Sequence, residues 1–233
     1  MTEDDIIPTL RACGISAICG SVIQVEDKND YANAFEKVKS ANRTALALAE
    51  RMGGYYIPGF HIHPDFVEES LDEIEFMANK GIHLIGELVP NLDGYKGYDH
   101  KGLFPLLESA ARHSMVVNFH TMNPESIDKM VSEHPNLTFV AAHPGEREQL
   151  LLHVERMKKY DNLYLDISGT GIFRMYSLRY LVHTVGSERL LFGTDYPTCN
   201  PGVYVGGVLT EPLTDSEREN IFSNNAKRLL KLS

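Results

Sequence analysis

The sequence has 233 residues, 43% of them hydrophobic and 23% charged, which is enough apolar material for a packed core and excludes a disordered chain. Its 22 basic and 32 acidic side chains give a net charge of −10, and no basic run stands out, which argues against binding to nucleic acid or to an anionic membrane surface. There is no apolar run of about 18 residues and no secretion signal at the N-terminus. The three cysteines do not suit a disulfide framework, so we expect a cytoplasmic protein.

Short β-rich apolar runs alternate with helical patterns along the whole chain. The predicted strands are Ile15–Gly20, Tyr55–His63, His83–Pro90, Met115–Thr121, Thr138–His143, Leu163–Ser168 and Leu190–Asp195. The first predicted helix is capped by Thr2 and ends before Gly14. The other predicted helices are Asp30–Met52, Asp65–Asn79, Lys101–His113, Pro124–Glu133, Glu146–Tyr160, Phe173–Val185 and Thr214–Leu232, the last with a capping box at its start. Runs this dense in Val, Ile, Leu and Phe are typical of a parallel sheet covered on both faces.

Strict alternation without a break in composition predicts one α/β domain over residues 1–233 with right-handed crossovers. Seven predicted strands leave two architectures open, a doubly wound sheet or a (β/α)8 TIM-barrel-like fold that lacks one strand. No glycine-rich phosphate loop follows the first predicted strand, as a dinucleotide-binding sheet would require. The barrel is also favoured by the reactive side chains, which fall at strand ends.

Four of these side chains point to a divalent metal. Glu87, His120, His143 and Asp195 each lie at or near the end of a separate predicted strand. Because side chains alternate between the two faces of a strand, His120, His143 and Asp195 share the inward parity of their strands. Imidazoles and carboxylates are ligands for zinc, manganese, cobalt or iron, and we expect zinc first.

Three further residues keep two interpretations each. Asp166 either supports an inward ligand or is a plain carboxylate at a strand end. His61 and His63 form the one His-x-His motif of the chain. They either chelate an ion or line the wall of a substrate site, and we weight the wall or substrate role more heavily. Glu87 itself also fits a carboxylate held in a salt bridge.

Four segments together resemble the amidohydrolase superfamily, and within it the amidohydrolase 2 branch of barrel hydrolases and decarboxylases. They are Asn118–Thr121, Ala142–Gly145, Leu191–Pro197 and Asn224–Leu230, and the resemblance runs from Thr2 to Leu232. It implies that His120, His143 and Asp195 are ligands at the fifth, sixth and eighth barrel strands, with Asp195 also the proton shuttle. Glu87 is similar to a fourth-strand carboxylate ligand of TatD-like members.

The family's first strand, which ends in His-x-His and supplies two ligands, has no counterpart in the sequence. We therefore expect unpaired edges at Ile15–Cys19 and Leu190–Gly193, weakened metal binding, and association into a homo-oligomer. The expected function is metal-dependent hydrolysis of a small carbonyl substrate, in which Asp195 moves the proton. The alternatives are a decarboxylase of the same branch and a catalytically impaired barrel. The loops Asn91–His100 and Tyr196–Leu213 are expected to contribute substrate contacts, the second as a lid.

Overall fold

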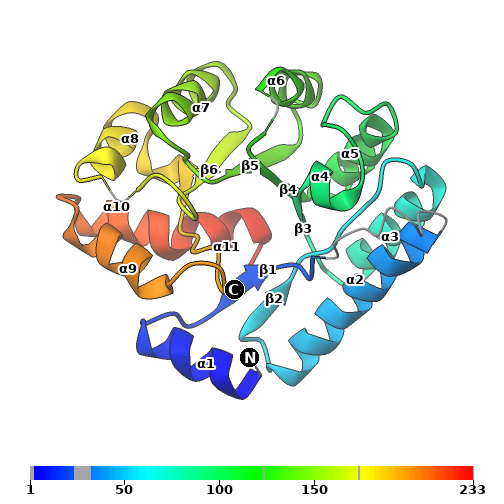
Figure 1. Ribbon diagram of the computed structural model, residues 1–233, viewed down its shortest axis with the longest axis horizontal. Coiled ribbons are helices and arrows are strands. Elements are labelled where there is room, and N and C mark those ends of the chain that lie inside the picture. The colour runs from blue at the N-terminus through cyan, green and yellow to red at the C-terminus, as the bar shows by residue number, and fades with distance from the viewer. Residues whose placement is uncertain (1–2, 24–32, 123, 173, 233) are drawn as a thin grey trace. The chain divides into compact units, whose positions relative to one another are not determined.

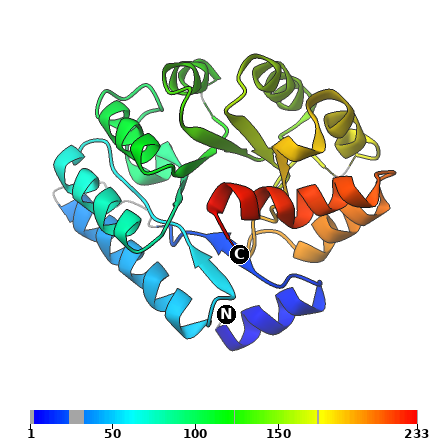
Figure 2. The ribbon, with the colours of Figure 1, turned by 180° about the vertical axis from the view of Figure 1, so that it is seen from behind.

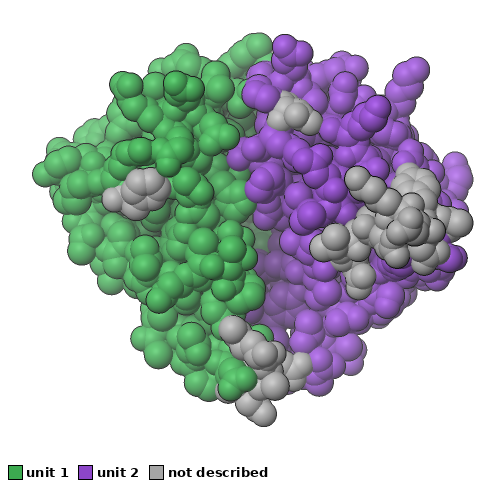
Figure 3. Space-filling model, in the orientation of Figure 1, with its two compact units in different colours: residues 1–15, 140–233 green, residues 16–139 purple. Residues whose placement is uncertain are grey.

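The computed structural model describes residues 3–23, 33–122, 124–172 and 174–232. The predicted helix starts at Thr2, Asp30 and Phe173 lie outside the described residues. Contacts divide the chain into two compact units, residues 16–139 and residues 1–15 with 140–233, which Figure 3 colours separately. The single domain expected from the sequence stays a prediction, and each unit is described by itself.

The unit of residues 16–139 alternates strands with helices. Its elements are β1 (Ile18–Gly20), α2 (Ala34–Arg51), β2 (Tyr56–Pro58), α3 (Val67–Asn79), β3 (Leu84–Leu88), α4 (Pro90–Asp93), α5 (Leu103–Arg112), β4 (Val116–His120) and α6 (Pro124–Glu133). Helix α2 runs beside β2 (Figure 1), and α3 packs beside α5, as the view from behind shows (Figure 2). Phe60, Ile74 and Phe119 are fully buried between these elements, at about 1.5–3 kcal/mol of stabilisation each.

The other unit continues the same alternation. It contains α1 (Glu3–Ala12), the end of β5 (Thr138–Ala142), α7 (Arg147–Lys159), β6 (Leu163–Asp166), α8 (Ser177–Val185), the 3-10 turn η2 (Ser187–Arg189), β7 (Leu190–Leu191) and α9 (Pro201–Thr210). The chain then runs through α10 (Asp215–Glu219), the π-helical turn η3 (Asn220–Asn224) and α11 (Asn225–Leu230). The predicted capping box is present, because Thr214 accepts from the Glu217 amide while the Glu217 carboxylate accepts from Thr214.

The seven predicted strands are all found in the described residues, which confirms an α/β fold. Strands β1 and β2 pair in parallel, and β3-β4-β5-β6-β7 form a second sheet in sequence order, parallel at β3-β4 and at β6-β7. A parallel bridge between Phe60 and Ile85 follows β2. Strand β1 is an edge strand of the first sheet, and β7 is an edge strand of the second. The expected homo-oligomer stays a prediction.

The side chains of Arg189 and Asn225 hold strand ends in place within residues 140–233. Arg189 donates to the carbonyls of Met157, Tyr160 and Leu163, where α7 meets β6. Asn225 donates to the carbonyls of Ser187 and Leu190, both at 2.8 Å. The second interaction explains Asn225 of the Asn-Asn motif, because its buried amide donates to two backbone carbonyls of the preceding turn and strand.

The two expected substrate loops are more ordered than predicted. Helix α9 occupies the middle of Tyr196–Leu213, started by Asn200, whose side chain accepts from the Gly202 amide at 2.9 Å. In Asn91–His100, Tyr95 and Tyr98 are 5% and 0% exposed, so both rings belong to the core instead of standing over a site. Over the described residues, every helix is too short or too polar to cross a bilayer.

We expect the buried ring of His153 to make the fold sensitive to acid. This ring is 2% exposed, its Nδ1 has no hydrogen-bond partner among the described residues, and burial lowers its pKa from 6.5 to about 4. The unfolded chain therefore binds more protons between these values, so stability should fall as the pH drops from about 6.5 to about 4.

His153→Met should raise stability by about 1–2 kcal/mol and flatten that dependence, because it removes an unpaired polar atom. Urea unfolding between pH 4 and 7 measures it, with exposed His183→Met on α8 as the control. If the free energy of unfolding of His153→Met depended on pH as steeply as that of wild type, His153 would not be the source of the acid sensitivity.

Candidate metal centre

The position of Glu87 is set by a bulge in β3. Ile85 pairs with Val117 and Leu88 with Phe119, so one extra residue of β3 stands opposite β4. Gly86 adopts φ +95°, and a Cβ there would lie 2.1 Å from the carbonyl oxygen of Asn118. Only glycine fits such a backbone and such a close approach. The bulge presents the Glu87 carboxylate at the end of the strand.

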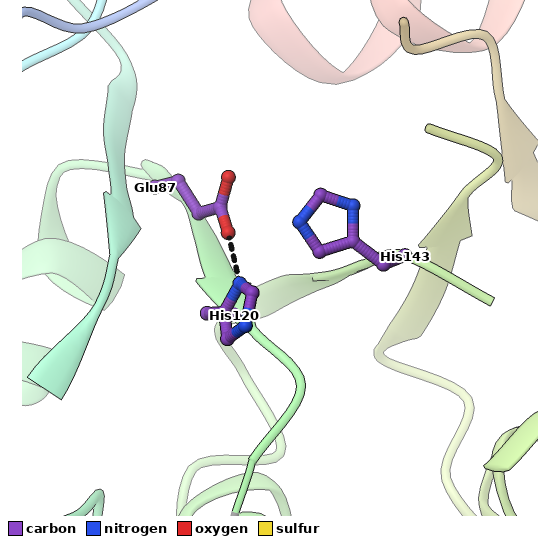
Figure 4. Close-up of side chains that lie close together, drawn as sticks. All are labelled: Glu87, His120 and His143. Carbon is purple, nitrogen blue, oxygen red and sulfur yellow. Dashed lines mark hydrogen bonds and ion pairs between the residues drawn. The ribbon is translucent and has the colours of Figure 1, made fainter. Parts of the chain in front are cut away.

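Glu87 and His120 already contact one another. The Glu87 Oε1 lies 2.8 Å from the His120 Nδ1, an ion pair or hydrogen bond between two partly buried side chains (Figure 4). The salt-bridge interpretation of Glu87 and the ligand interpretation are therefore compatible, since a cation would take the place of the proton that the two groups share.

Tyr98 holds the ends of these two strands together. Its fully buried hydroxyl lies 3.0 Å from the carbonyl oxygen of Leu88 and 2.7 Å from that of His120. Burial raises the pKa of this phenol well above its ordinary value, so the hydroxyl stays a donor. Tyr98 lies in the loop that was expected to contact substrate, whereas the structure shows that it fixes β3 against β4 beside Glu87 and His120.

His143 is oriented by a serine and a carboxylate of the next strand. The Ser168 hydroxyl donates to Asp166 Oδ1 at 2.5 Å. Ser168 Oγ also lies 3.0 Å from His143 Nδ1. Because the hydroxyl proton is directed at Asp166, His143 Nδ1 is the donor to Ser168, and Nε2 is then the ring nitrogen that carries the lone pair needed for a ligand bond. Asp166 thus supports His143 through Ser168, in agreement with the first of the two interpretations of Asp166.

Two glycines make room for this relay. A Cβ on Gly169 would stand 2.4 Å from His143 Nδ1, and one on Gly193 would stand 3.0 Å from the Asp166 carboxyl. The Gly193 of the Gly-Thr-Asp motif is therefore explained by its contact with Asp166.

Glu87, His120 and His143 follow one another at the ends of β3, β4 and β5 of one sheet. One ligand atom of each lies within 4.8 Å of the others, as Figure 4 shows. Asp195, the fourth predicted ligand, is not in this group in the part of the chain that the structure describes.

Asp195 stands beside a cysteine that the sequence did not single out. Cys199 Sγ lies 3.8 Å from Asp195 Oδ2, and the Cys199 amide donates to the Asp195 carbonyl at 3.0 Å. Asp195 has φ +58° and His143 has φ +71°, a conformation that costs side-chain-bearing residues about 1–3 kcal/mol. Strain of this kind is concentrated at functional positions, which supports both residues as site members.

The His-x-His motif lies beyond the end of β2, and its two rings differ. His63 Nε2 contacts the carbonyl of Asp93 at 2.8 Å, and its Nδ1 accepts from the Asp65 amide at 3.2 Å. Both nitrogens of that ring are thus engaged by backbone. His61 Nε2 contacts Ser21 Oγ at 2.7 Å.

Comparison with known proteins found a matching family model and several similar solved structures. A family model described as Amidohydrolase matches residues 5–232. No curated protein matches the chain. Several solved structures share the fold. A 2,6-dihydroxybenzoate decarboxylase from Rhizobium is 18% identical with a TM-score of 0.83, covering 100% of this chain and 89% of that one.

Two other similar structures are also decarboxylases. A 5-carboxyvanillate decarboxylase from Sphingomonas paucimobilis is 14% identical with a TM-score of 0.79, covering 100% of this chain and 84% of that one. A dihydroxybenzoic acid decarboxylase from Polaromonas, solved with bound manganese and an inhibitor, is 17% identical with a TM-score of 0.75, covering 100% and 86%. At these identities the likeness establishes the parallel α/β TIM-barrel type of fold.

Proposed function

Since the chain belongs to the amidohydrolase family, we propose that it is a metal-dependent hydrolase of small carbonyl compounds whose ion is held by Glu87, His120 and His143 and whose proton shuttle is Asp195. The observation that carries this proposal is the convergence of Glu87, His120 and His143 at consecutive strand ends. Three protein donors are the set that catalytic sites use when one position stays open for water or substrate.

The residues present fit a divalent cation. Nitrogen and carboxylate oxygen donors suit zinc and manganese alike, and one ion is reached by donors that lie no more than about 4–5 Å apart. The Asp166–Ser168 relay fixes the His143 tautomer that leaves Nε2 able to coordinate. A bound ion would act as a Lewis acid on the substrate carbonyl and lower the pKa of its water.

The chain's own groups would handle the protons. Asp195 is proposed to accept the proton of the attacking water and return it to the leaving group. Cys199, at 3.8 Å, and the strained backbone hold the Asp195 carboxylate in place. His143 keeps its Nδ1 proton throughout, because this N–H group donates a hydrogen bond to Ser168 Oγ.

Decarboxylation of an aromatic acid is the second candidate, favoured by the three similar structures described above, which are structures of decarboxylases. A substrate carboxylate would need a cationic partner. The sequence offers Arg147 and Arg174 for that role, and Arg174 forms an ion pair with Glu146 at 2.6 Å. For decarboxylation, the Arg174 guanidinium would have to release Glu146 and bind the substrate carboxylate. The proposed hydrolysis requires no such exchange of partners.

The test uses the full chain, stripped with a chelator and reloaded separately with zinc or manganese. Metal content is measured by mass spectrometry, and turnover is measured on ester, lactone and amide panels and as CO2 release from hydroxybenzoates. We expect stoichiometric metal and hydrolysis that requires it. Metal-dependent CO2 release without hydrolysis would replace the first candidate by the second. Absence of metal retention and of turnover with either ion would overturn both.

A further inference from the structure

Ser21, His61 and Asp93 form a contiguous chain of side chains that includes none of the proposed metal ligands. All three belong to residues 16–139: Ser21 directly follows β1, His61 follows β2, and Asp93 ends α4. Ser21 Oγ lies 2.7 Å from His61 Nε2, and His61 Nδ1 lies 3.9 Å from Asp93 Oδ1. The order hydroxyl, imidazole, carboxylate, with each ring nitrogen facing a different partner, is the arrangement of a nucleophilic serine site.

The backbone of His61 is held by a buried asparagine. Asn42 accepts from the His61 amide at 2.8 Å and donates to the His61 carbonyl at 3.0 Å. Asn42 also donates to Glu73, and Glu73 forms a bidentate ion pair with Arg43. This network fixes the backbone from which the His61 ring projects before any substrate arrives.

The polarity of the contacts suits base catalysis. The Asp93 carboxylate is itself held by the Val89 amide at 2.9 Å, and its negative charge favours the His61 tautomer with the proton on Nδ1. At 3.9 Å this pair is electrostatic, and His61 Nδ1 has no hydrogen-bond partner among the described residues. Nε2 is then the acceptor of the Ser21 proton. Ser21 is partly exposed, whereas His61 is 3% exposed, so the hydroxyl is the group that a solute reaches.

We propose that Ser21 is an activated nucleophile, with His61 as its base and Asp93 as the orienting carboxylate, and that it supports a metal-independent acyl transfer from small carboxylic esters. Ser21 Oγ bonds to the ester carbonyl carbon while its proton passes to His61 Nε2. The carbon–alkoxide bond breaks, and the alkoxide leaves with that proton as an alcohol. Water then repeats the sequence on acyl-Ser21, restoring the hydroxyl and releasing the acid.

The test uses the full chain after metal removal by a chelator, so that it is independent of the proposed hydrolase. A fluorophosphonate reporter and 4-nitrophenyl acetate are the probes. We expect stoichiometric labelling that peptide mass spectrometry places on Ser21, and an initial burst of nitrophenol. Ser21→Ala should lose both, whereas Ser132→Ala, an exposed serine of α6 in the same unit, should keep both.

Asp93→Asn separates a relay from an accidental contact. It keeps the acceptor for the Val89 amide and should slow labelling at least about tenfold. Circular dichroism and the unfolding midpoint check that each variant is folded. An unlabelled wild-type chain, or equal labelling of wild type and Ser21→Ala, would overturn the proposal whatever the metal-loaded protein does. So would an Asp93→Asn variant that reacts at the wild-type rate.

Discussion

Gly86→Ala should destabilise the protein by about 4 kcal/mol or more, the largest effect that we expect of a single methyl group. The added Cβ would lie 2.1 Å from the Asn118 carbonyl oxygen and 2.5 Å from the Leu88 amide nitrogen. Both atoms are backbone of paired strands, so neither can move without breaking the pairing of β3 with β4. The φ of +95° adds strain for any side chain.

Gly81→Ala is the matched control, because Gly81 has φ +74° but a Cβ there meets nothing within 4 Å. It isolates the strain of the left-handed backbone, about 1–2 kcal/mol. Urea unfolding gives both free energies. If the two variants lost the same amount, the close approach of Gly86 to β4 would be disproved.

His143→Ala should lower metal affinity by more than about 100-fold, and Ser168→Ala by about 10–100-fold. The first removes the ligand. The second leaves the ligand in place but removes the oxygen that accepts the His143 Nδ1 proton, at 3.0 Å. Without that acceptor the ring samples both tautomers and other rotations, and only part of the population presents Nε2.

Competition with a chelator of known affinity measures both constants for zinc and for manganese. Ser223→Ala is the control and should bind metal as wild type does, because the Ser223 hydroxyl donates to the Glu219 carbonyl one turn earlier in the C-terminal helical segment. An affinity of Ser168→Ala equal to that of the control would show that the relay does not orient the ligand. Unchanged affinity in His143→Ala would remove His143 from the proposed ligand set.

The order of strands and helices was readable from the sequence because it depends on local signals. Dense apolar β-branched runs marked all seven strands, and Thr214 with Glu217 marked the start of the last helix. The placement of Glu87, His120 and His143 at one edge also followed, since parallel strands bring their carboxyl ends together. One local reading was wrong: glycines and Pro201 made α9 look like a loop, and the buried Tyr204 and Val208 now anchor that helix.

Only the tertiary structure decided which distant groups meet. The bulge at Gly86 depends on the register of β4, the His143 relay joins residues 25 apart, and Ser21 meets His61 across 40 residues. Periodicity reports the face on which a side chain lies, but it carries no information about the neighbour on the next strand. That neighbour is fixed by strand register and by how each crossover helix packs, which are properties of the whole sheet. The sequence by itself therefore determined the elements and the edge where the chemistry gathers, and the packed sheet determined the hydrogen bonds that orient it.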